Sequence, residues 1–322
     1  MKRPRILSGV QPSGKLHLGN YFGAIRQHIA LQAEGECFFF IADLHALTTI
    51  QDRQALSENV SAVALDYLAL GLDPEVTAFF RQADIPEVTE LAWILSTVTG
   101  MGLLERAHSY KDKLARGIAP SVGLFTYPIL MAADILLYKS NLVPVGQDQV
   151  QHIEMTRDMA GYFNQTYRKV FPLPEQRLDR APTVPGTDGK KMSKSYGNTI
   201  EIFAEGKALR SAVMGIVTDS TPVEAPKDPE RDNVFALYAL FATPAEKEAL
   251  AARYRAGGLG YGDAKKLLIE KIETHFAAAR QMRKRLAADP RVVEATLARG
   301  AERARAVALE TMREVREATG LR

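Results

Sequence analysis

The run "RILSGV" (Arg5 to Val10) passes directly into the polar, glycine-bearing stretch "QPSGKLHLGN" (Gln11 to Asn20). A short apolar run closed by turn-forming residues predicts a buried strand. A helical pattern begins near Asn20, so this part of the chain predicts a strand that turns at once into a helix. Strands followed by helices are the units from which parallel α/β sheets are built.

Three further runs of this kind follow within the first 150 residues, and helical patterns lie between them. The runs are "CFFFIAD" (Cys37 to Asp43), "VTAFFRQ" (Val76 to Gln82) and "LVPVG" (Leu142 to Gly146), and the helical patterns span Asn20 to Ala33, Ser57 to Leu70 and Glu87 to Thr99. The alternation predicts a doubly wound, Rossmann-like α/β fold. Because ligands of such sheets bind at the carboxyl ends of the strands, the loops after Val10, Asp43 and Val145 are candidate site loops.

The strand signals stop after about residue 198, and residues 207–320 indicate helices separated by proline and glycine. We therefore expect a Rossmann-like catalytic domain over residues 1–198 and a smaller all-helical region over residues 199–322. The last helix, about residues 291–322, is rich in Ala, Arg and Glu. We expect it to lie on a surface, with packing back onto the first domain as an option.

Composition excludes several classes of protein. The chain has 322 residues, 46% of them hydrophobic and 25% charged, and no apolar stretch of membrane-spanning length or signal-peptide form. We expect a cytoplasmic protein. Cys37 is the single cysteine and the six histidines do not cluster, so no disulfide and no protein-held metal is expected. Residues 246–322 hold 17 Lys and Arg against 11 Asp and Glu, which indicates either a solvated helical face or a surface that meets phosphates.

Two stretches suggest phosphate chemistry. The first strand-to-helix turn offers backbone N–H groups at a helix start, with His17 and Asn20 as neutral donors, although it has neither GxGxxG nor GxxxxGK[ST]. Further on, "KMSKS" (Lys191 to Ser195) is flanked by glycines and is typical of a mobile loop. Its two lysines could neutralise charge that develops on a polyphosphate.

The stretch "YPILMAADILLY" (Tyr127 to Tyr138) carries a single charge, Asp134. An unpaired buried carboxylate costs several kcal/mol, so Asp134 requires a partner. That partner is either a group of the protein itself, such as a backbone N–H, an Arg or a Lys, or a donor on a bound substrate.

Taken together, "PSGKLHLGN" and "KMSKS" resemble the paired ATP-binding motifs of the class I aminoacyl-tRNA synthetases. Asn20 departs from the family's usual second histidine, and this version is similar to that of the bacterial tryptophanyl enzymes. "ADLHALT" (Ala42 to Thr48), "TYPILMAADILLY" (Thr126 to Tyr138) and "VPVGQDQVQHIEMTRDMA" (Val143 to Ala160) resemble the same subgroup. The resemblance extends to about Asn198.

The resemblance implies roles for individual residues. It implies that Asp134 accepts the indole N–H of tryptophan, and that Tyr127 and Gln149 hold the amino group. The remaining tryptophan-binding residues would be His45, Met131, Val143 and Val145. It implies ATP contacts at Gln11, Pro12, Ser13, Gly19, Asn20, Gly146, Gln147, Asp148, Lys191, Met192, Ser193, Lys194 and Ser195, with Asp148 on the ribose. The groups expected to support catalysis are His17, Asn20, Lys111, Lys191 and Lys194.

The activity implied is attachment of L-tryptophan to tRNA(Trp) through a tryptophanyl-adenylate, with ATP and Mg²⁺, in a homodimer whose basic helical part meets tRNA. Three alternatives stay open at this point. They are a tyrosyl enzyme, which shares the KMSKS loop; a class I-type nucleotidylyltransferase that does not use tRNA; and a non-catalytic RNA-binding relative.

Overall fold

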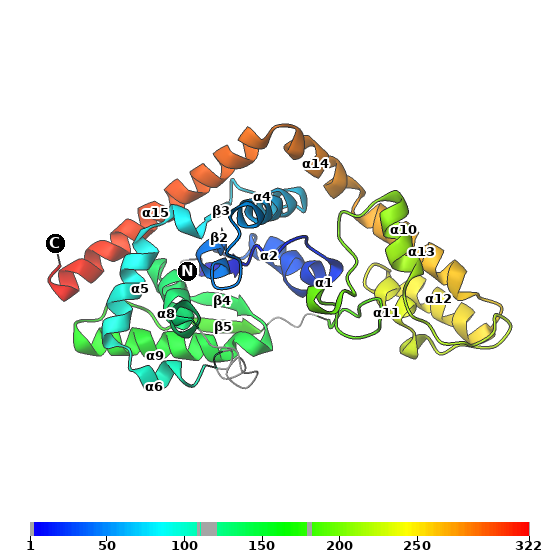
Figure 1. Cartoon of the computed structure of the whole chain (residues 1–322), viewed down its shortest axis with the longest axis horizontal. Coiled ribbons are helices and arrows are strands. Elements are labelled where there is room, and N and C mark those ends of the chain that lie inside the picture. Colours follow the sequence, from blue (N-terminus) through cyan, green and yellow to red (C-terminus); the bar gives the residue numbers. More distant parts are fainter. Residues whose placement is uncertain (1–2, 108–109, 111–120, 179–181, 322) are drawn as a thin grey trace. The chain divides into compact units, whose positions relative to one another are not determined.

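The computed structural model describes residues 3–107, 110, 121–178 and 182–321 (Figure 1). These residues form two compact units. The sheet unit comprises the described residues of Met1–Gly14, His28–Asp179 and Leu286–Arg322, and the helical unit comprises those of Lys15–Gln27 and Arg180–Arg285. The division differs from the boundary expected near residue 198, because the segment with His17 belongs to the helical unit and the last helix belongs to the sheet unit. No helix in the described ranges is long and apolar enough to cross a membrane.

The sheet has five strands in the order β3-β2-β1-β4-β5, and all four neighbouring pairs are parallel. This is the predicted doubly wound α/β fold, and the order reverses direction between β1 and β4. The strands are β1 (Arg5–Val10), β2 (Glu36–Ile41), β3 (Thr77–Arg81), β4 (Leu142–Val145) and β5 (Glu175–Leu178).

The four predicted strands correspond to β1 to β4, but β5 was not predicted. Its sequence is "EQRL", and its side chains are exposed or half-buried. It pairs with β4 from Glu175 to Leu178. An edge strand of polar residues lacks the apolar run by which buried strands are recognised, so its partner strand decides its conformation.

Alternate residues of the central strands face opposite sides of the sheet, as the pleat of a strand requires. Phe38 stacks on Tyr138, with ring centroids 5.0 Å apart, next to the C-terminal end of α8. Phe39, the next residue of β2, lies on the other side against His28, at 5.2 Å. The run "CFFFI" is therefore apolar throughout because helices cover both faces of the sheet.

The helices that surround the sheet include α5, α8 and α9, which pack on one another (Figure 1). Asp52 and Ser121 cap α4 and α8 by accepting hydrogen bonds from backbone N–H groups of their first turns. The elements are α3 (Asp43–Ala46), α4 (Arg53–Ala69), η2 (Gln82–Asp84), α5 (Glu87–Val98), α6 (Met101–Leu104), α8 (Val122–Leu137), η3 (Gln147–Gln149), α9 (Val150–Thr166) and α15 (Pro290–Thr319).

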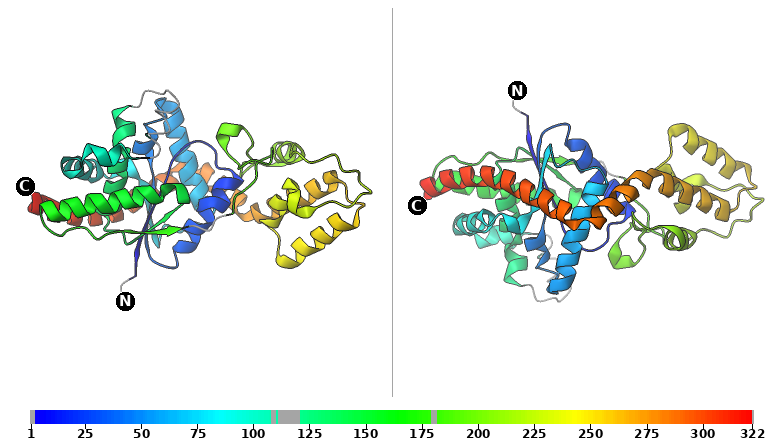
Figure 2. Two further views of the ribbon diagram at one scale, coloured as in Figure 1. Left: turned by 90° about the horizontal axis from the view of Figure 1, so that it is seen from below. Right: turned by 90° about the horizontal axis from the view of Figure 1, so that it is seen from above.

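The last helix, α15, is the orange-to-red helix of Figures 1 and 2 and contacts β3, α5 and α8. The expectation of a surface helix is only half right, because one face of α15 is buried through small residues such as Gly300, Ala304 and Ala308. A Cβ atom on Gly300 would lie 1.9 Å from the carbonyl oxygen of Phe79. Glycine therefore lets the helix backbone approach the edge strand β3 closely, which protects an edge that would otherwise be free to pair with another chain.

The helical unit contains the short α1 (Leu18–Asn20), the π-helix η1 (Tyr21–Ile25) and the KMSKS segment. The ammonium of the buried Lys265 donates to the carbonyls of Met214 and Ile216, at 2.9 and 2.7 Å. The other elements of this unit are η4 (Lys194–Tyr196), α10 (Gly206–Met214), η5 (Pro229–Arg231), α11 (Asn233–Ala239), α12 (Pro244–Ala256) and α13 (Tyr261–His275), while α2 (Arg26–Leu31) and α14 (Ala277–Ala288) carry residues of both units.

Candidate active site

A cavity of about 150 Å³ lies in the sheet unit where β1 and β4 diverge. The sequence made the loops after Val10, Asp43 and Val145 candidates for a site, and all three contribute to the cavity, through Gln11, His45 and Gln149. The lining residues are Leu7, Ser8, Gly9, Gln11, Phe40, Ala42, His45, Tyr127, Met131, Asp134, Ile135, Val143, Pro144, Val145, Gln149 and His152. Nine of the sixteen lining residues are apolar and seven carry polar side chains, and such a mixture of apolar walls and polar groups is typical of a small-molecule site.

Asp134 lies on α8, lines the cavity and is only 3% exposed. Its Oδ2 atom is 2.9 Å from Nε2 of His45, which comes from α3 after the second strand. The amide of Gln82 donates to Oδ1 at 2.8 Å and to Oδ2 at 3.0 Å. The carboxylate thus has partners within the protein, an imidazole and an amide rather than the Arg, Lys or backbone N–H that we considered, and it also forms part of the cavity wall.

Burial raises the pKa of Asp134 above its ordinary value, while the hydrogen bonds from His45 and Gln82 oppose this shift. Gln82 is itself buried and begins η2, directly after β3. Gln82 was not among the residues predicted for the site. The rule that sites gather at strand ends would have found it, because Gln82 follows the apolar run of the third strand.

Gln11, Tyr127, Gln149 and His152 also contribute polar side chains to the lining of the cavity. The hydroxyl of Tyr127 is hydrogen-bonded to Nε2 of His152. Of the seven residues that we predicted for tryptophan, all seven line this cavity: Asp134, His45, Tyr127, Met131, Val143, Val145 and Gln149. His152 and Ser8 line it as well and were not predicted.

The turn that begins α1 belongs to the helical unit. The side-chain oxygen of Asn20 accepts from the backbone N–H of His17 at 3.0 Å. The His17 ring is buried, and its Nδ1 atom has no hydrogen-bond partner in the described structure. Burial, with a smaller contribution from the charge of Lys194, lowers the pKa of His17 to about 4. His17 is therefore a neutral imidazole at physiological pH.

The KMSKS segment lies directly against this turn. The backbone N–H of Gly19 points to the sulfur of the buried Met192 at 3.4 Å. The backbone N–H of Leu18 donates to Ile200 at 3.0 Å, and that of Ile202 donates to Leu16 at 3.1 Å. The two motifs, more than 170 residues apart in the sequence, are therefore neighbours within one compact unit.

Around the lysines the loop has a defined conformation. Ser193 caps the short helix η4, which starts at Lys194, and its hydroxyl accepts from the backbone N–H of Ser195 at 3.3 Å. Gly197 ends this turn in the left-handed conformation. Lys191 and Lys194 are both exposed, and desolvation by the atoms packed around it lowers the pKa of Lys194.

The other predicted nucleotide contacts are distributed over both units. Gln11, Pro12 and Ser13 follow β1, and Gly146 and Gln147 follow β4, all in the sheet unit. Lys111 and the side chain of Asp148 lie outside the described part of the structure. Gly19, Asn20 and the KMSKS residues lie in the helical unit.

Comparison with known proteins agrees with this geometry. A family model described as tRNA synthetases class I (W and Y) matches residues 1–277. A tryptophan–tRNA ligase from Rhodopirellula baltica is 57% identical over 319 residues, which cover 99% of this chain and 100% of that protein.

Solved structures show the same likeness. The tryptophanyl-tRNA synthetase of Campylobacter jejuni, complexed with ADP and tryptophan, is 48% identical with a TM-score of 0.94, covering 98% of this chain and 100% of that one. The Mycoplasma pneumoniae enzyme is 29% identical with a TM-score of 0.81, covering 99% of this chain and 98% of that one. The chain belongs to the class I tRNA synthetase family that comprises the tryptophan and tyrosine enzymes.

Proposed function

We propose that the chain attaches L-tryptophan to its cognate tRNA in two ATP-dependent steps. The observation that carries this conclusion is the cavity at the β1/β4 reversal, which has apolar walls and the buried Asp134 among its lining residues. Relatives that share 43–57% of their residues with this chain over nearly its full length are tryptophan–tRNA ligases. The chemistry of the cavity lining and the family membership thus support the same substrate.

We propose that Asp134 accepts the indole N–H of tryptophan. A carboxylate in an apolar wall selects for a ring that carries a hydrogen-bond donor. A substrate without that donor would leave a buried acceptor unpaired, which costs binding free energy. Gln82 and His45 fix the orientation of the carboxylate. Met131, Val143 and Val145 supply apolar walls for the ring, and Tyr127 and Gln149 hold the amino group.

The nucleotide contacts remain proposals for both units. In the sheet unit they are Gln11, Pro12, Ser13, Gly146, Gln147 and Asp148, and in the helical unit Gly19, Asn20 and residues 191–195. MgATP enters as the co-substrate. Among the described residues no group of three or more His, Cys, Asp or Glu side chains could hold a metal ion. Phosphate oxygens and water are therefore the ligands that we propose for Mg²⁺.

The proposed chemistry needs no protein nucleophile. A carboxylate oxygen of tryptophan forms a bond to the α-phosphorus, the bond from that phosphorus to the bridging oxygen breaks, and pyrophosphate leaves. The ribose hydroxyl of the tRNA 3′ end then takes the acyl group and AMP leaves. Lys191, Lys194, Lys111, His17 and Asn20 would act by positioning the phosphates and by stabilising their charge.

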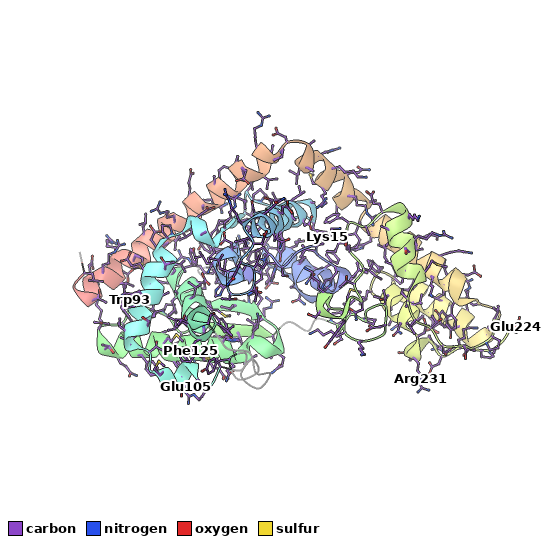
Figure 3. All side chains as sticks on the ribbon, in the orientation of Figure 1. Lys15, Trp93, Glu105, Phe125, Glu224 and Arg231 are labelled. Carbon is purple, nitrogen blue, oxygen red and sulfur yellow. The ribbon has the colours of Figure 1, made fainter. Side chains whose placement is uncertain are left out.

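Two partners follow from the same proposal. We propose that tRNA(Trp) contacts the basic C-terminal part of the chain. We also propose that the protein acts in the cytoplasm and that it is a homodimer. The dimer is supported by exposed apolar side chains on α5, α6 and α8, of which α8 packs on both of the others. Trp93, labelled in Figure 3, is 73% exposed, and Met101 and Val122 are also exposed. Aromatic residues and Met are enriched at protein interfaces.

The tyrosyl alternative is not favoured, because the close relatives are tryptophan enzymes. Neither a nucleotidylyltransferase nor a non-catalytic relative explains why the chain is 51–57% identical to tryptophan–tRNA ligases over nearly its whole length.

The test is ATP–pyrophosphate exchange with the purified full-length chain and each of the twenty amino acids in turn. We expect exchange with tryptophan and not with tyrosine. Exchange with tyrosine alone would show a tyrosyl enzyme, and an inert protein would show that the chemistry has been lost. Charging of a tRNA transcript with tryptophan then tests the second step, and exchange without charging would indicate an adenylylating enzyme that does not use tRNA.

A further inference from the structure

Asn198 stands three residues after the KMSKS segment and is 2% exposed. Its side-chain oxygen accepts from the backbone N–H of Ser193 at 2.8 Å. Its amide nitrogen donates to Oδ1 of Asp188 at 2.6 Å and to the carbonyl of Lys191 at 3.2 Å. The amide thus uses three of its four hydrogen-bonding positions, all of them within the loop that carries the two lysines.

The surrounding backbone is built to receive this side chain. A Cβ atom on Gly186 would lie 2.2 Å from the amide nitrogen of Asn198, so a larger residue at 186 would displace the side chain. The backbone N–H of Thr187 donates to the carbonyl of Asn198 at 3.0 Å. Asn198 is therefore fixed by hydrogen bonds of both its side chain and its main chain.

These contacts fix the backbone on either side of Met192, since the carbonyl of Lys191 and the N–H of Ser193 both bond to the same amide. Met192 in turn contacts the backbone of Gly19. A change at Asn198 would therefore move the lysine-bearing backbone relative to the turn that carries His17, without removing any group that meets the nucleotide.

We propose that Asn198 is a positioning residue for the activation step: it holds the KMSKS loop in the geometry that presents Lys191 and Lys194 to the triphosphate. This inference rests on the proposed function, because it assumes that the two lysines act on ATP. A misplacement of catalytic groups by about 1 Å can cost roughly a hundredfold in rate, and that is the size of effect to be expected.

The first experiment compares Asn198→Ala with the unaltered chain in the exchange assay. We expect kcat/KM for ATP to fall roughly tenfold to a hundredfold, while the Kd for tryptophan, measured by calorimetry without ATP, stays unchanged. The matched control is Asn164→Ala. Asn164 makes a similar set of bonds, with Phe171 as acceptor at 2.9 Å and the N–H groups of Val170 and Phe171 as donors at 2.8 and 3.0 Å, but it has no part in the nucleotide loop.

Thermal unfolding of both variants separates positioning from stability. A purely structural role would give Asn198→Ala and Asn164→Ala similar losses of thermal stability and similar, small effects on the KM for ATP. Positioning would give a defect in ATP use at Asn198 alone, at temperatures where both variants are folded.

A reciprocal exchange tests the particular contact. Asn198→Asp alone places two carboxylates in contact and should be the worst single variant. In Asp188→Asn combined with Asn198→Asp, the new amide at 188 can donate to the new carboxylate at 198, and Ser193 keeps its acceptor. The carbonyl of Lys191 loses its donor, and the backbone N–H of Lys190 loses the oxygen of residue 188 that accepts from it at 3.0 Å. We therefore expect partial, not full, recovery of kcat/KM for ATP relative to Asn198→Asp.

The outcomes are separable from those of the proposed function. If the unaltered chain does not exchange pyrophosphate with tryptophan, the proposed function fails. If it does, and Asn198→Ala has the same kcat and the same KM for ATP as the unaltered chain, or the double variant recovers nothing, the positioning role is wrong while the function stands.

Discussion

Gln82 donates hydrogen bonds to both carboxylate oxygens of Asp134, at 2.8 and 3.0 Å, from the first turn after β3. The sequence posed two options for the buried acid, a partner within the protein or a partner on the substrate. The structure shows that the first does not exclude the second. A carboxylate has about four acceptor positions, so it can bond to Gln82 and His45 and still accept from a ligand in the cavity.

Asp134→Asn is expected to weaken tryptophan binding by roughly tenfold to a hundredfold, the cost of about 1.5–3 kcal/mol for a hydrogen bond to a charged group. ATP binding should stay nearly unchanged. Calorimetric titration of each substrate measures both. The matched control is Asp232→Asn, a buried acid of the helical unit that accepts from the hydroxyl of Tyr254; it should lower stability and leave the tryptophan Kd unchanged. Equal loss of both substrates at Asp134 would indicate a structural role instead.

Gln82→Leu should make tryptophan binding more sensitive to acid. The hydrogen bond from Gln82 opposes the rise in the pKa of Asp134 that burial causes, so its loss raises that pKa further. The acid then takes up a proton at a higher pH and ceases to be a charged acceptor. We expect the pH at which tryptophan affinity declines to move upward in the variant, measured as Kd against pH between about 5 and 8. An unchanged profile would show that His45 alone controls this titration.

Lys194→Ala is expected to slow the activation step more than it weakens tryptophan binding, because its charge meets the phosphates and not the amino acid. Pre-steady-state measurement of adenylate formation, beside tryptophan Kd, checks this. The control is Lys190→Ala, which removes an exposed lysine just outside the KMSKS segment. Similar loss in both variants would mean that general positive charge, rather than the position of Lys194, accounts for the effect.

His28 makes the fold sensitive to mild acid. Its ring lies between Ser8 (Oγ to Nε2, 2.9 Å) and Tyr67 (Nδ1 to hydroxyl oxygen, 3.2 Å), and burial lowers its pKa from 6.5 to about 4. Below pH 6.5 the unfolded chain binds a proton that the folded chain does not, so stability falls as the pH drops toward 4. The loss from this group is about 3 kcal/mol at most. Urea unfolding should show a shallower decline from pH 7 to 5 in His28→Gln than in the unaltered chain. Parallel declines would show that other groups, such as His17, account for it.

Gly300→Ala should destabilise the sheet unit by about 1–3 kcal/mol or more, because the added methyl group meets the carbonyl of Phe79 and forces α15 away from β3. The control is Gly161→Ala on α9, where nothing lies within 4 Å of the added atom. That change should stabilise the protein by about 0.5–1 kcal/mol, as alanine generally does in a helix. Chemical unfolding measures both, and a neutral Gly300→Ala would mean that α15 can shift at no cost.

The predicted fold was confirmed where local pattern and burial coincide. The strands β1 to β4 are apolar because helices cover both sides of the sheet, so their sequences reveal them. β5 was missed because its four residues are exposed or half-buried and owe their conformation to pairing with β4. The packing of α15 was only partly foreseen, since small residues such as Gly300 and Ala304 lack the large apolar side chains by which a buried face is usually recognised.

By itself the sequence determined the α/β class, because apolar strands and helical periodicity are local properties of the chain. Through the resemblance of its motifs it also indicated the family and seven of the residues that line the cavity. The tertiary structure alone decided that Gln82 donates hydrogen bonds to Asp134 and that the turn with His17 lies in the same compact unit as Met192. Contacts of that kind depend on where distant segments meet in space. They are selected by the free energy of burying those segments together, and not by neighbouring residues in the chain.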